Sequence, residues 1–441
     1  ERRRRHGTVS LHRTREIIPH INIMTEIRAH YLIETPLPVE QTAAAIAGEQ
    51  STGTFMKLAS ETDAVTARAG AHVARIERLA EVPVPSLPGA RASGRARYTQ
   101  ALVEIAWPYA NVGPDLQTLM ATICGNLGEL SELSGIRLLD LELPDDFVRA
   151  FPGPRFGIAG TRERLRLDGL PAIGTIVKPS IGLLPEDTAQ VVAEFAEGGI
   201  DFIKDDELSA NPLFAPLEQR IAAVMGAIER HADRTGKRIM FAFNITGDLD
   251  QMRRGAEAIL KAGGDCAMLS LNWVGTPAVL ALRREFPLFI HGHRNGWALF
   301  SRAPMLGFDY RVYQLIHRLA GVDHIHVNGL RNKFAESDES VLASARACLT
   351  PLNEADPRIM PVLSSAQTVL QVHDTYAALR TTDLIYACGG GIVGHPDGIA
   401  AGTRALRAAW EAARAGIPLA TAAKEMPALK RAVETFERHA K

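Results

Sequence analysis

The fold class is decided by the stretch IGTIVKPSIGLLPEDTAQVVAEFAEGGIDFIKDDE, residues 173–207. It opens with a run rich in apolar and β-branched residues, Ile173–Lys178, continues through a segment of helical composition, Glu186–Gly198, and reaches a second apolar run, Ile200–Asp206. Two strands joined by a segment long enough for a crossover helix form a right-handed βαβ unit. This stretch therefore predicts parallel strands.

The same rhythm recurs along the rest of the chain and gives eight apolar runs. The other six are Arg238–Asn244, Cys266–Trp273, Pro287–Arg294, His324–Asn328, Ile359–Ser364 and Asp383–Gly389. Continuous apolar runs, rather than strict alternation, are typical of strands that are buried on both faces. Eight such units predict an α/β fold with a (β/α)8 TIM barrel over residues 154–441.

The chain before the barrel has a mixed pattern. Ile27–Glu34 and Tyr98–Trp107 resemble strands, and Val39–Glu49 looks helical. Two prolines and a glycine in Phe151–Arg155 oppose the continuation of either regular element. We therefore predict a smaller α+β N-terminal domain over residues 24–153.

Composition narrows the class of protein. The 441 residues carry 49 Lys and Arg against 50 Asp and Glu, and this neutrality argues against nucleic acid as a partner. The four cysteines are far apart and include no CxxC pair, which predicts buried thiols in a reducing cytoplasm. Residues 1–23 are rich in arginine and lack an apolar run, so we expect a disordered or non-native leader rather than a secretory signal.

A membrane partner is also unexpected. The longest uncharged window of interest, Cys266–Leu282, is too short for a membrane span and is interrupted by Asn272, Gly275 and Pro277. We predict that it is a strand entering a loop.

Polar side chains collect at the carboxyl ends of the predicted strands, which meet at the face of a barrel where active sites are built. They are Lys178, Lys204, Asp205, Asp206, Glu207, Asn244, His291, His293, Arg294, His324, His326 and Ser364. A role as unrelated loop residues would have to hold independently at most of the strands. The set predicts one active site.

The three adjacent carboxylates after Lys204 point to a cation. Such a cluster is tolerable when it is solvated, paired, or bound to a hard cation through its oxygens. On a strand, Lys204 and Asp206 project to the same side, with Glu207 at the start of the loop. Mg2+ is the simplest occupant, and a solvated charge run is the alternative.

Anion sites have two candidates. Gly389, Gly390 and Gly391 follow the last run, where backbone N–H groups of barrel loops often bind phosphate, although a plain turn has the same composition. Arg294 and His326 could bind a second anion, while a structural salt bridge is the alternative for Arg294.

Several stretches resemble the large subunit of ribulose bisphosphate carboxylase, and especially its form IV relatives, the RuBisCO-like proteins. They are GTIVKPSIGL (174–183), GIDFIKDDE (199–207), DHIH (323–326) and GGGIVGHP (389–396), together with EQSTGTF (49–55) and Gly125-Asn126. The order and spacing also match. The resemblance covers nearly all of the chain from Met24 to the final helices.

The resemblance implies roles for the barrel residues. Lys204 would react with CO2 to form a carbamate, which would bind Mg2+ together with Asp206 and Glu207. Lys178 is similar to the lysine that works as acid or base on the enediol, and His293 matches a catalytic histidine that lies, with Arg294, near the substrate's hydroxyl and distal end. Lys333 matches a mobile catalytic lysine. The resemblance further implies distal and phosphate contacts from Arg294, His326, Ser364, Gly389 and Gly390.

The resemblance also implies a second chain. Thr54 would complete the phosphate cradle, Asn126 would reach the substrate, and Glu49 would pair with Lys333. In the family these three residues come from a neighbouring subunit. We therefore expect a homodimer or a higher homo-oligomer with shared active sites.

The chain departs from the carboxylase pattern. Ser180 replaces a second lysine, Trp297 replaces a histidine, and Ser364-Ser365-Ala366 replaces Ser-Gly-Gly. The loop before Lys333 lacks the carboxylase's Gly-Thr-Val-Val-Gly. These changes argue against bisphosphate binding and against CO2 fixation on ribulose bisphosphate.

Mg2+-dependent enolate chemistry on a phosphorylated keto sugar or sugar acid remains. Because Lys333 is retained, we favour decarboxylation of 3-oxo-isoapionate 4-phosphate, with the lysine holding the substrate carboxylate. The alternative is an enolase or isomerase acting on a methylthio-sugar phosphate in methionine salvage. A non-catalytic regulatory scaffold is a third hypothesis, against which the retention of Lys178 and the Lys204 cluster speaks.

Overall fold

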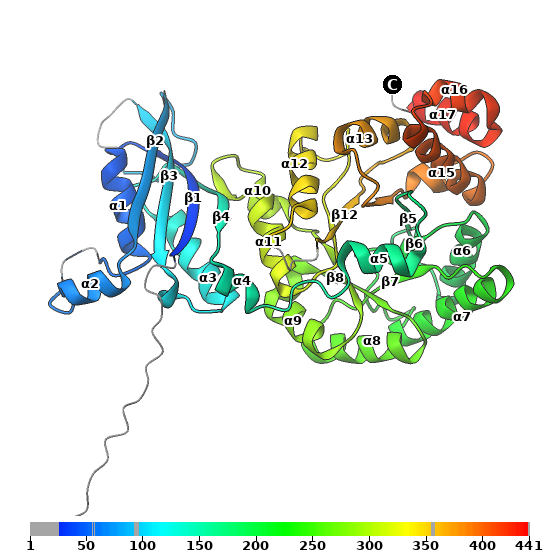
Figure 1. Ribbon diagram of the computed structural model, residues 1–441, viewed down its shortest axis with the longest axis horizontal. Coiled ribbons are helices and arrows are strands. Elements are labelled where there is room, and N and C mark those ends of the chain that lie inside the picture. The colour runs from blue at the N-terminus through cyan, green and yellow to red at the C-terminus, as the bar shows by residue number, and fades with distance from the viewer. Residues whose placement is uncertain (1–25, 55, 57, 92–96, 354–357, 440–441) are drawn as a thin grey trace, which may run out of the picture.

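The computed structural model describes residues 26–54, 56, 58–91, 97–353 and 358–439. Figure 1 shows an N-terminal part built on a sheet beside a barrel ringed by helices. The prediction made for residues 1–23 lies outside the described residues. Within the described residues, no helix is long and apolar enough to cross a membrane.

The N-terminal sheet has the strand order β10-β4-β1-β3-β2. Its strands are β1 (Glu26–Thr35), β2 (His72–Val82), β3 (Tyr98–Pro108), β4 (Gly135–Glu142) and β10 (Leu306–Phe308). Buried and half-buried residues alternate along most of β1, as expected of a strand with one face on a core. The helices of this part are α1 (Val39–Glu49), α2 (Asp63–Ala69), α3 (Leu116–Ile123) and α4 (Asp145–Arg149).

The edge strand β10 was not predicted. It lies in the barrel half of the sequence and pairs in parallel with β4, with Phe308 opposite Leu138. The barrel chain therefore contributes a strand to the N-terminal sheet. Arg137 of β4 reinforces this junction, because its guanidinium donates to the carbonyls of Ser301 and Ala303 at 3.2 and 3.1 Å.

The predicted TIM barrel is confirmed, since eight parallel strands close in the order β5-β6-β7-β8-β9-β11-β12-β13. Their bounds are β5 Ala172–Ile176, β6 Phe202–Lys204, β7 Met240–Asn244, β8 Cys266–Ser270, β9 Phe289–His293, β11 His324–His326, β12 Met360–Leu363 and β13 Ile385–Ala387. Every residue of β7 and β8 is buried, which explains their continuous apolar composition.

Helices follow the strands and cover the outside of the barrel (Figure 1). The longer ones are α5 (Gly157–Leu165), α6 (Pro185–Glu197), α7 (Leu217–Thr235), α8 (Leu249–Lys261), α9 (Leu271–Glu285), α11 (Tyr310–Ala320), α12 (Asp338–Leu349), α13 (Val372–Leu379) and α15 (Ile399–Ala415). The shortest are α10 (Ala298–Ser301) and α14 (Gly390–Val393), and α16 (Leu419–Glu425) and α17 (Pro427–His439) end the fold. Local sequence sets where they start; Asp248, for example, accepts from the backbone N–H of Gln251 at 2.8 Å before α8.

One local prediction is wrong. The window from Cys266 is a strand entering a helix rather than a loop, because α9 begins directly at Leu271. Gly275, with φ 74°, interrupts the helical geometry, and Pro277 follows it. The glycine and the proline therefore mark a kink inside the helical segment, and the chain remains helical beyond them.

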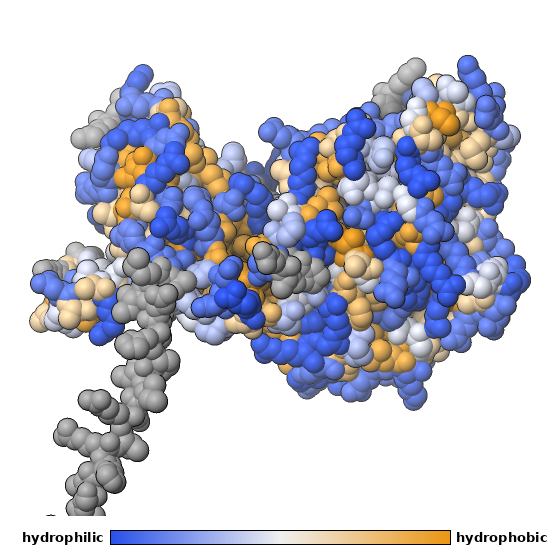
Figure 2. Space-filling view, in the orientation of Figure 1, coloured by the Kyte–Doolittle hydropathy of each residue, from blue (hydrophilic) through white to orange (hydrophobic). Residues whose placement is uncertain are grey.

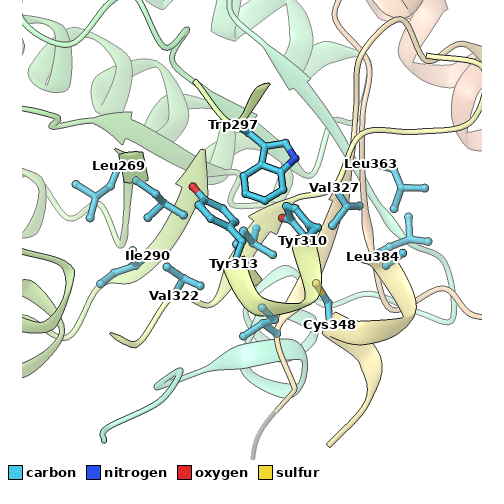
Figure 3. Packing of buried hydrophobic residues seen from close by; sticks show 14 of the residues in the cluster. Leu269, Ile290, Trp297, Tyr310, Tyr313, Val322, Val327, Cys348, Leu363 and Leu384 are labelled. Atoms are coloured by element: carbon cyan, nitrogen blue, oxygen red, sulfur yellow. The ribbon is translucent and has the colours of Figure 1, made fainter. Parts of the chain in front are cut away.

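The core has two layers around the barrel wall. One cluster fills the lower lumen with residues such as Phe202, Met240, Cys266, Phe289 and Met360. A larger cluster lies between strands and helices and extends into the N-terminal part. Figure 3 shows part of it, where Trp297, Tyr310 and Tyr313 lie side by side. On the face drawn in Figure 2, hydrophilic side chains cover much of the barrel part, with smaller hydrophobic patches between them.

The cysteines are free thiols, as predicted. Cys266, Cys348 and Cys388 are buried, whereas Cys124 is only half-buried. Burial raises the pKa of Cys348 to about 12, so this thiol stays protonated and is a packing group.

Candidate active site

A cavity of about 720 Å³ opens at the carboxyl ends of the barrel strands. Because side chains alternate along a strand, the lumen-facing positions that follow the apolar floor point into this cavity. The structure brings together the predicted barrel residues there: Lys178, Lys204, Asp206, Glu207, His293, Arg294, His326, Lys333, Ser364, Gly389 and Gly390.

Lys178 lines the cavity just beyond β5. Its Nζ donates to Asp206 Oδ2 at 2.7 Å and to Ser180 Oγ at 2.8 Å. Ser180 stands where the carboxylase pattern has a second lysine, so this departure supplies a hydroxyl that orients the remaining one. The two hydrogen bonds hold the amine of Lys178 at the wall of the cavity.

Lys204 ends β6 and is fully buried. Its Nζ donates to the Asp205 carbonyl at 2.9 Å and lies 3.4 Å from Glu207 Oε2. Burial lowers the pKa of Lys204, and the charges of Glu207 and Asp206 oppose this shift. The shift favours the neutral amine, which is the form that reacts with CO2.

His293 lines the cavity beside Glu207. Its Nε2 lies 3.5 Å from Glu207 Oε2. Burial, followed by the charge of Lys204, lowers the pKa of His293 to about 4, so the imidazole is neutral near pH 7. Burial raises the pKa of Glu207, but its interactions with His293 and Lys204 and a backbone hydrogen bond outweigh burial and lower it, so the Glu207 carboxylate is ionised near pH 7.

Asp205 faces the opposite side of the strand, away from the cavity. Its Oδ2 accepts from the backbone N–H of Asn244 at 2.9 Å and lies 3.3 Å from the guanidinium of buried Arg220. The side chain of Asn244 in turn donates to the carbonyls of Asp206 and Glu207 at 3.1 and 3.2 Å. Asp205 and Asn244 therefore position the two carboxylates that do face the cavity.

The glycines after β13 divide into two kinds. A Cβ at Gly391 would meet the Gln367 carbonyl at 2.1 Å, so this glycine is required by packing. No heavy atom lies within 4 Å of the Cβ position of Gly390, and the nearest to that of Gly389 is Lys178 Cε at 3.7 Å. The backbone at Gly389 and Gly390 is thus open to the cavity beside Lys178, as a phosphate cradle requires.

The Arg294 end of the cavity is already occupied by a carboxylate of the same chain. Arg294 Nη2 forms a short ion pair with Glu336 Oε2. The same oxygen accepts from Asn328 Nδ2 at 2.6 Å, and Ser340 Oγ donates to Glu336 Oε1 at 2.9 Å. The Tyr310 ring lies behind Arg294, with 5.0 Å between Cζ and the ring centroid. The structure therefore places Arg294 in a salt bridge.

His326 is fixed through both ring nitrogens. Nε2 lies 2.8 Å from His291 Nε2, and Nδ1 lies 3.0 Å from Ser364 Oγ. Burial, followed by the charges of His293 and His291, lowers the pKa of His326 well below its ordinary value. His326 is a neutral group of the cavity wall near pH 7.

Ser365 and Ala366 adopt left-handed backbone angles, with φ of 71° and 63°. Glycine is the usual residue for that conformation, and glycines stand there in the carboxylase pattern. The chain keeps the left-handed turn and adds side chains to it. Ser365 Oγ donates to Asn328 Oδ1 at 2.7 Å, which fixes the amide that holds Glu336.

Sequence reasoning missed Glu336, Asn328 and Ser340. Glu336 follows Lys333 by three residues in a loop that departs from the carboxylase pattern, and this was the available signal. The partner of Glu336 is 42 residues away in sequence, so only the fold brings it to Arg294.

Lys333 lies on the rim and is exposed, with its Nζ 5.3 Å from the ring centroid of Phe334. The preceding residue anchors the loop, because Asn332 Nδ2 donates to the carbonyls of Gly329 and Glu336 at 3.1 Å. The lysine is therefore held at the mouth of the cavity by its neighbours and can reach a ligand there.

The three N-terminal residues lie elsewhere. Glu49, Thr54 and Asn126 are exposed and do not line the cavity. A Cβ at Gly125 would lie 2.5 Å from the side chain of Gln50, so the end of α1 and the end of α3 form one edge of the N-terminal part. Within one chain, these residues are not brought to the predicted site.

The side chains around Lys204 decide whether the cavity could bind a metal ion. Among the described residues, no group of three or more His, Cys, Asp and Glu side chains could hold a metal ion. Asp206 and Glu207 supply two carboxylates beside Lys204, and a carbamate on Lys204 would add a third anionic oxygen ligand. The residues therefore fit Mg2+ when the lysine is carbamylated.

Models of known protein families match almost the whole chain. Residues 24–147 match the N-terminal domain of the ribulose bisphosphate carboxylase large chain, and residues 157–436 match its catalytic domain. The chain is 54% identical to a 3-oxo-isoapionate-4-phosphate transcarboxylase/hydrolase of Xanthobacter autotrophicus, over 92% of this chain and 98% of the relative. It is 44% identical to a 3-oxo-isoapionate-4-phosphate decarboxylase of Rhizobium rhizogenes, over 92% and 97%.

Solved structures of similar proteins match the fold of this chain over nearly its whole length. A RuBisCO-like protein from Burkholderia fungorum matches with a TM-score of 0.88 and 46% identity, over 93% of this chain and 99% of that one. A dimeric archaeal RuBisCO from Hyperthermus butylicus matches with a TM-score of 0.80 and 31% identity, over 93% and 95%.

Proposed function

The chain belongs to the ribulose bisphosphate carboxylase large-chain family, and from this membership we propose that it cleaves the carboxylate from 3-oxo-isoapionate 4-phosphate. The observation that carries the proposal is the cavity itself, which joins one open glycine cradle, the amine of Lys178 beside it and Lys333 at the mouth. Two relatives, 54% and 44% identical, are named for this substrate.

The cavity suggests how the substrate would lie. Its phosphate would bind the open backbone at Gly389 and Gly390, and its carboxylate would face Lys333 at the mouth. The bond to the carboxylate then breaks, CO2 leaves, and the electron pair moves toward the neighbouring keto group to give an enolate. Lys178, which lies beside Gly389, donates the proton that completes the product.

The Mg2+ site would be formed by a carbamate on Lys204 with Asp206 and Glu207. The side chains of Lys178 and Lys204 lie beside these two carboxylates, with Lys178 Nζ 2.7 Å from Asp206 Oδ2 and Lys204 Nζ 3.4 Å from Glu207 Oε2. A carbamate on Lys204 would add a further negative charge to the two carboxylates, and a divalent cation would offset this concentration of negative charge. When bound, Mg2+ would polarise the substrate's keto group.

A second outcome is favoured by the 54% identical relative, which is named a transcarboxylase/hydrolase. We propose that both outcomes would begin with the loss of the carboxylate from the substrate carbon. They differ in whether CO2 is released or is transferred and followed by hydrolysis. The ratio of CO2 released to substrate consumed separates the two outcomes.

The test is an assay of the purified protein with Mg2+ and bicarbonate. We expect turnover of 3-oxo-isoapionate 4-phosphate and none of methylthioribulose 1-phosphate. Turnover of the second compound alone would replace the proposal with the isomerase alternative. Inactivity toward both would favour a non-catalytic scaffold.

We also propose a homodimer in which the edge carrying Glu49, Thr54 and Asn126 covers the cavity of the other chain. The exposure of these residues and their distance from their own cavity support this arrangement, as does the dimeric relative. Mixing inactive Glu49→Ala chains with inactive Lys178→Ala chains should restore partial activity, because one site of each hybrid is then intact. Verified hybrids that stay inactive would refute shared sites.

A further inference from the structure

We infer that Glu336 is a specificity-determining residue that excludes a second phosphate from the Arg294 end of the cavity. The inference deepens the proposed function, because it assigns the substrate a single phosphate, bound at the Gly389 end, and an uncharged oxygen at the other end.

The first support is the way in which Glu336 is held. Its carboxylate receives N–H donors from Arg294 and Asn328 and an O–H donor from Ser340. Hydrogen bonds between a carboxylate and a guanidinium are among the stronger ones in proteins, and removing one partner leaves the other unsatisfied. A ligand phosphate would therefore have to displace a carboxylate that has three partners.

The second support is charge. Arg294 and Glu336 cancel each other, and the adjacent His326 is neutral with both ring nitrogens engaged by His291 and Ser364. A phosphate dianion at this end would meet no net positive charge among these groups and would lie against a carboxylate. The same phosphate at Gly389 and Gly390 would find open backbone and the ammonium of Lys178.

The third support is a nitrogen of Arg294 that takes no part in the salt bridge. Arg294 Nη1 is buried and has no hydrogen-bond partner among the described residues. Arg294 itself is 7% exposed and lines the cavity. The two N–H groups on this one nitrogen can bind one hydroxyl or carbonyl oxygen of a substrate, whereas a phosphate presents three acceptor oxygens.

The network depends on a departure from the carboxylase pattern. Ser365 Oγ donates to Asn328 Oδ1, so the amide of Asn328 must turn its N–H group toward Glu336. A glycine in place of Ser365 could not make this hydrogen bond. Ser365 and Glu336 therefore act together in fixing the carboxylate against Arg294.

The test compares two polyols without a carbonyl group, ribitol 5-phosphate and ribitol 1,5-bisphosphate, so that binding is measured without turnover. Calorimetry on the full chain with Mg2+ and bicarbonate should show no tighter binding of the bisphosphate by the wild-type protein. In Glu336→Gln, which keeps the shape and an acceptor oxygen for Arg294, the bisphosphate should gain at least about tenfold in affinity. The monophosphate should be unaffected.

Two further variants make the test specific. Glu339→Gln removes an exposed carboxylate of α12 and should leave both affinities as in the wild type. Arg294→Met combined with Glu336→Gln should lose the gain, because the guanidinium would be the phosphate's partner. Stronger binding of the bisphosphate by the wild-type protein, or no gain in a folded Glu336→Gln variant, overturns the inference. Because no turnover is needed, either result is distinguishable from failure of the decarboxylation assay.

Discussion

The floor and the mouth of the barrel lumen are built from the same strands, yet one is a packed core and the other carries the chemistry. Along β6 and its continuation, the lumen-facing residues are Phe202, Lys204 and Asp206. Phe202 belongs to the apolar floor, whereas Lys204 and Asp206 line the cavity. A step of two residues along one strand therefore separates packing from charge.

The same step divides β11. His324 lies at the floor, where its Nε2 is 2.8 Å from Thr161 Oγ1 and its ring stacks on Phe289. His326, two residues on, lines the cavity. The position of a side chain along the lumen, more than its residue type, therefore decides whether it packs in the core or lines the cavity. Changes at the floor should alter stability, and changes at the mouth should alter activity.

The largest expected effect is a loss of activity when carboxylates at the mouth of the barrel lumen are replaced. Asp206→Asn and Glu207→Gln should each lower kcat/KM by at least about 4 kcal/mol equivalents, since each removes a charged ligand of the proposed Mg2+ site. Unfolding free energy should change by less than about 1 kcal/mol, because strand-end loops carry function more than stability. Steady-state kinetics and urea unfolding measure the two effects.

The neighbouring carboxylate is the matched control. Asp205→Asn leaves the buried guanidinium of Arg220 without its charged partner. We expect a loss of about 3 to 5 kcal/mol in unfolding free energy, the scale for breaking a buried ion pair. If Asp206→Asn were the more destabilising of the two variants, the division by strand face would be wrong.

The second expected effect is a loss of stability when a residue of the lumen floor is replaced. Phe202→Ala deletes a ring that is fully buried in the lower lumen and should cost about 3 to 5 kcal/mol of unfolding free energy. Phe334→Ala at the rim, where the side chain is 56% exposed, should cost less than about 0.5 kcal/mol. Equal losses in urea unfolding would mean that the floor is not a packed core.

The barrel could be predicted from sequence because its signal is local. Strands buried on both faces need continuous apolar runs, and each of the eight runs overlaps a barrel strand; seven contain it whole, and β5 begins at Ala172, one residue before its run. The alternation along strands also places Lys204 and Asp206 on one side. These features depend on neighbours in sequence.

Other features depend on partners distant in sequence. The strand β10 has three residues, and only its pairing with β4 makes it a strand. Likewise the ion pair of Glu336 with Arg294 follows from the meeting of two barrel loops. The hypothesis that Arg294 binds an anion could not reveal that the anion belongs to the chain.

The third expected effect is a loss of activity from a single residue at the mouth, Lys333. Lys333→Met should lower kcat/KM by roughly 2 to 4 kcal/mol equivalents, the scale for lost electrostatic stabilisation of a transition state. The exposed side chain makes no ion pair among the described residues, so stability should not change. Lys261→Met on α8 removes an exposed charge far from the cavity and should leave kcat/KM intact. A similar loss in both variants would remove Lys333 from the reaction.

The smallest effect tests the floor through pH. His324 is fully buried against Phe202 and Phe289, and burial lowers its pKa to about 4. The unfolded chain, with an ordinary histidine pKa of about 6.5, binds the proton first as pH falls, so stability is present above that value and is lost between pH 6.5 and 4. At pH 5 the loss from this one group is about 2 kcal/mol. His324→Gln should therefore reduce the fall in unfolding free energy between pH 7 and pH 5 by about that amount, whereas His439→Gln on the exposed C-terminal helix should leave it unchanged. Urea unfolding at the two pH values measures the difference, and an unaltered fall in His324→Gln would mean that this imidazole is not kept neutral by the floor.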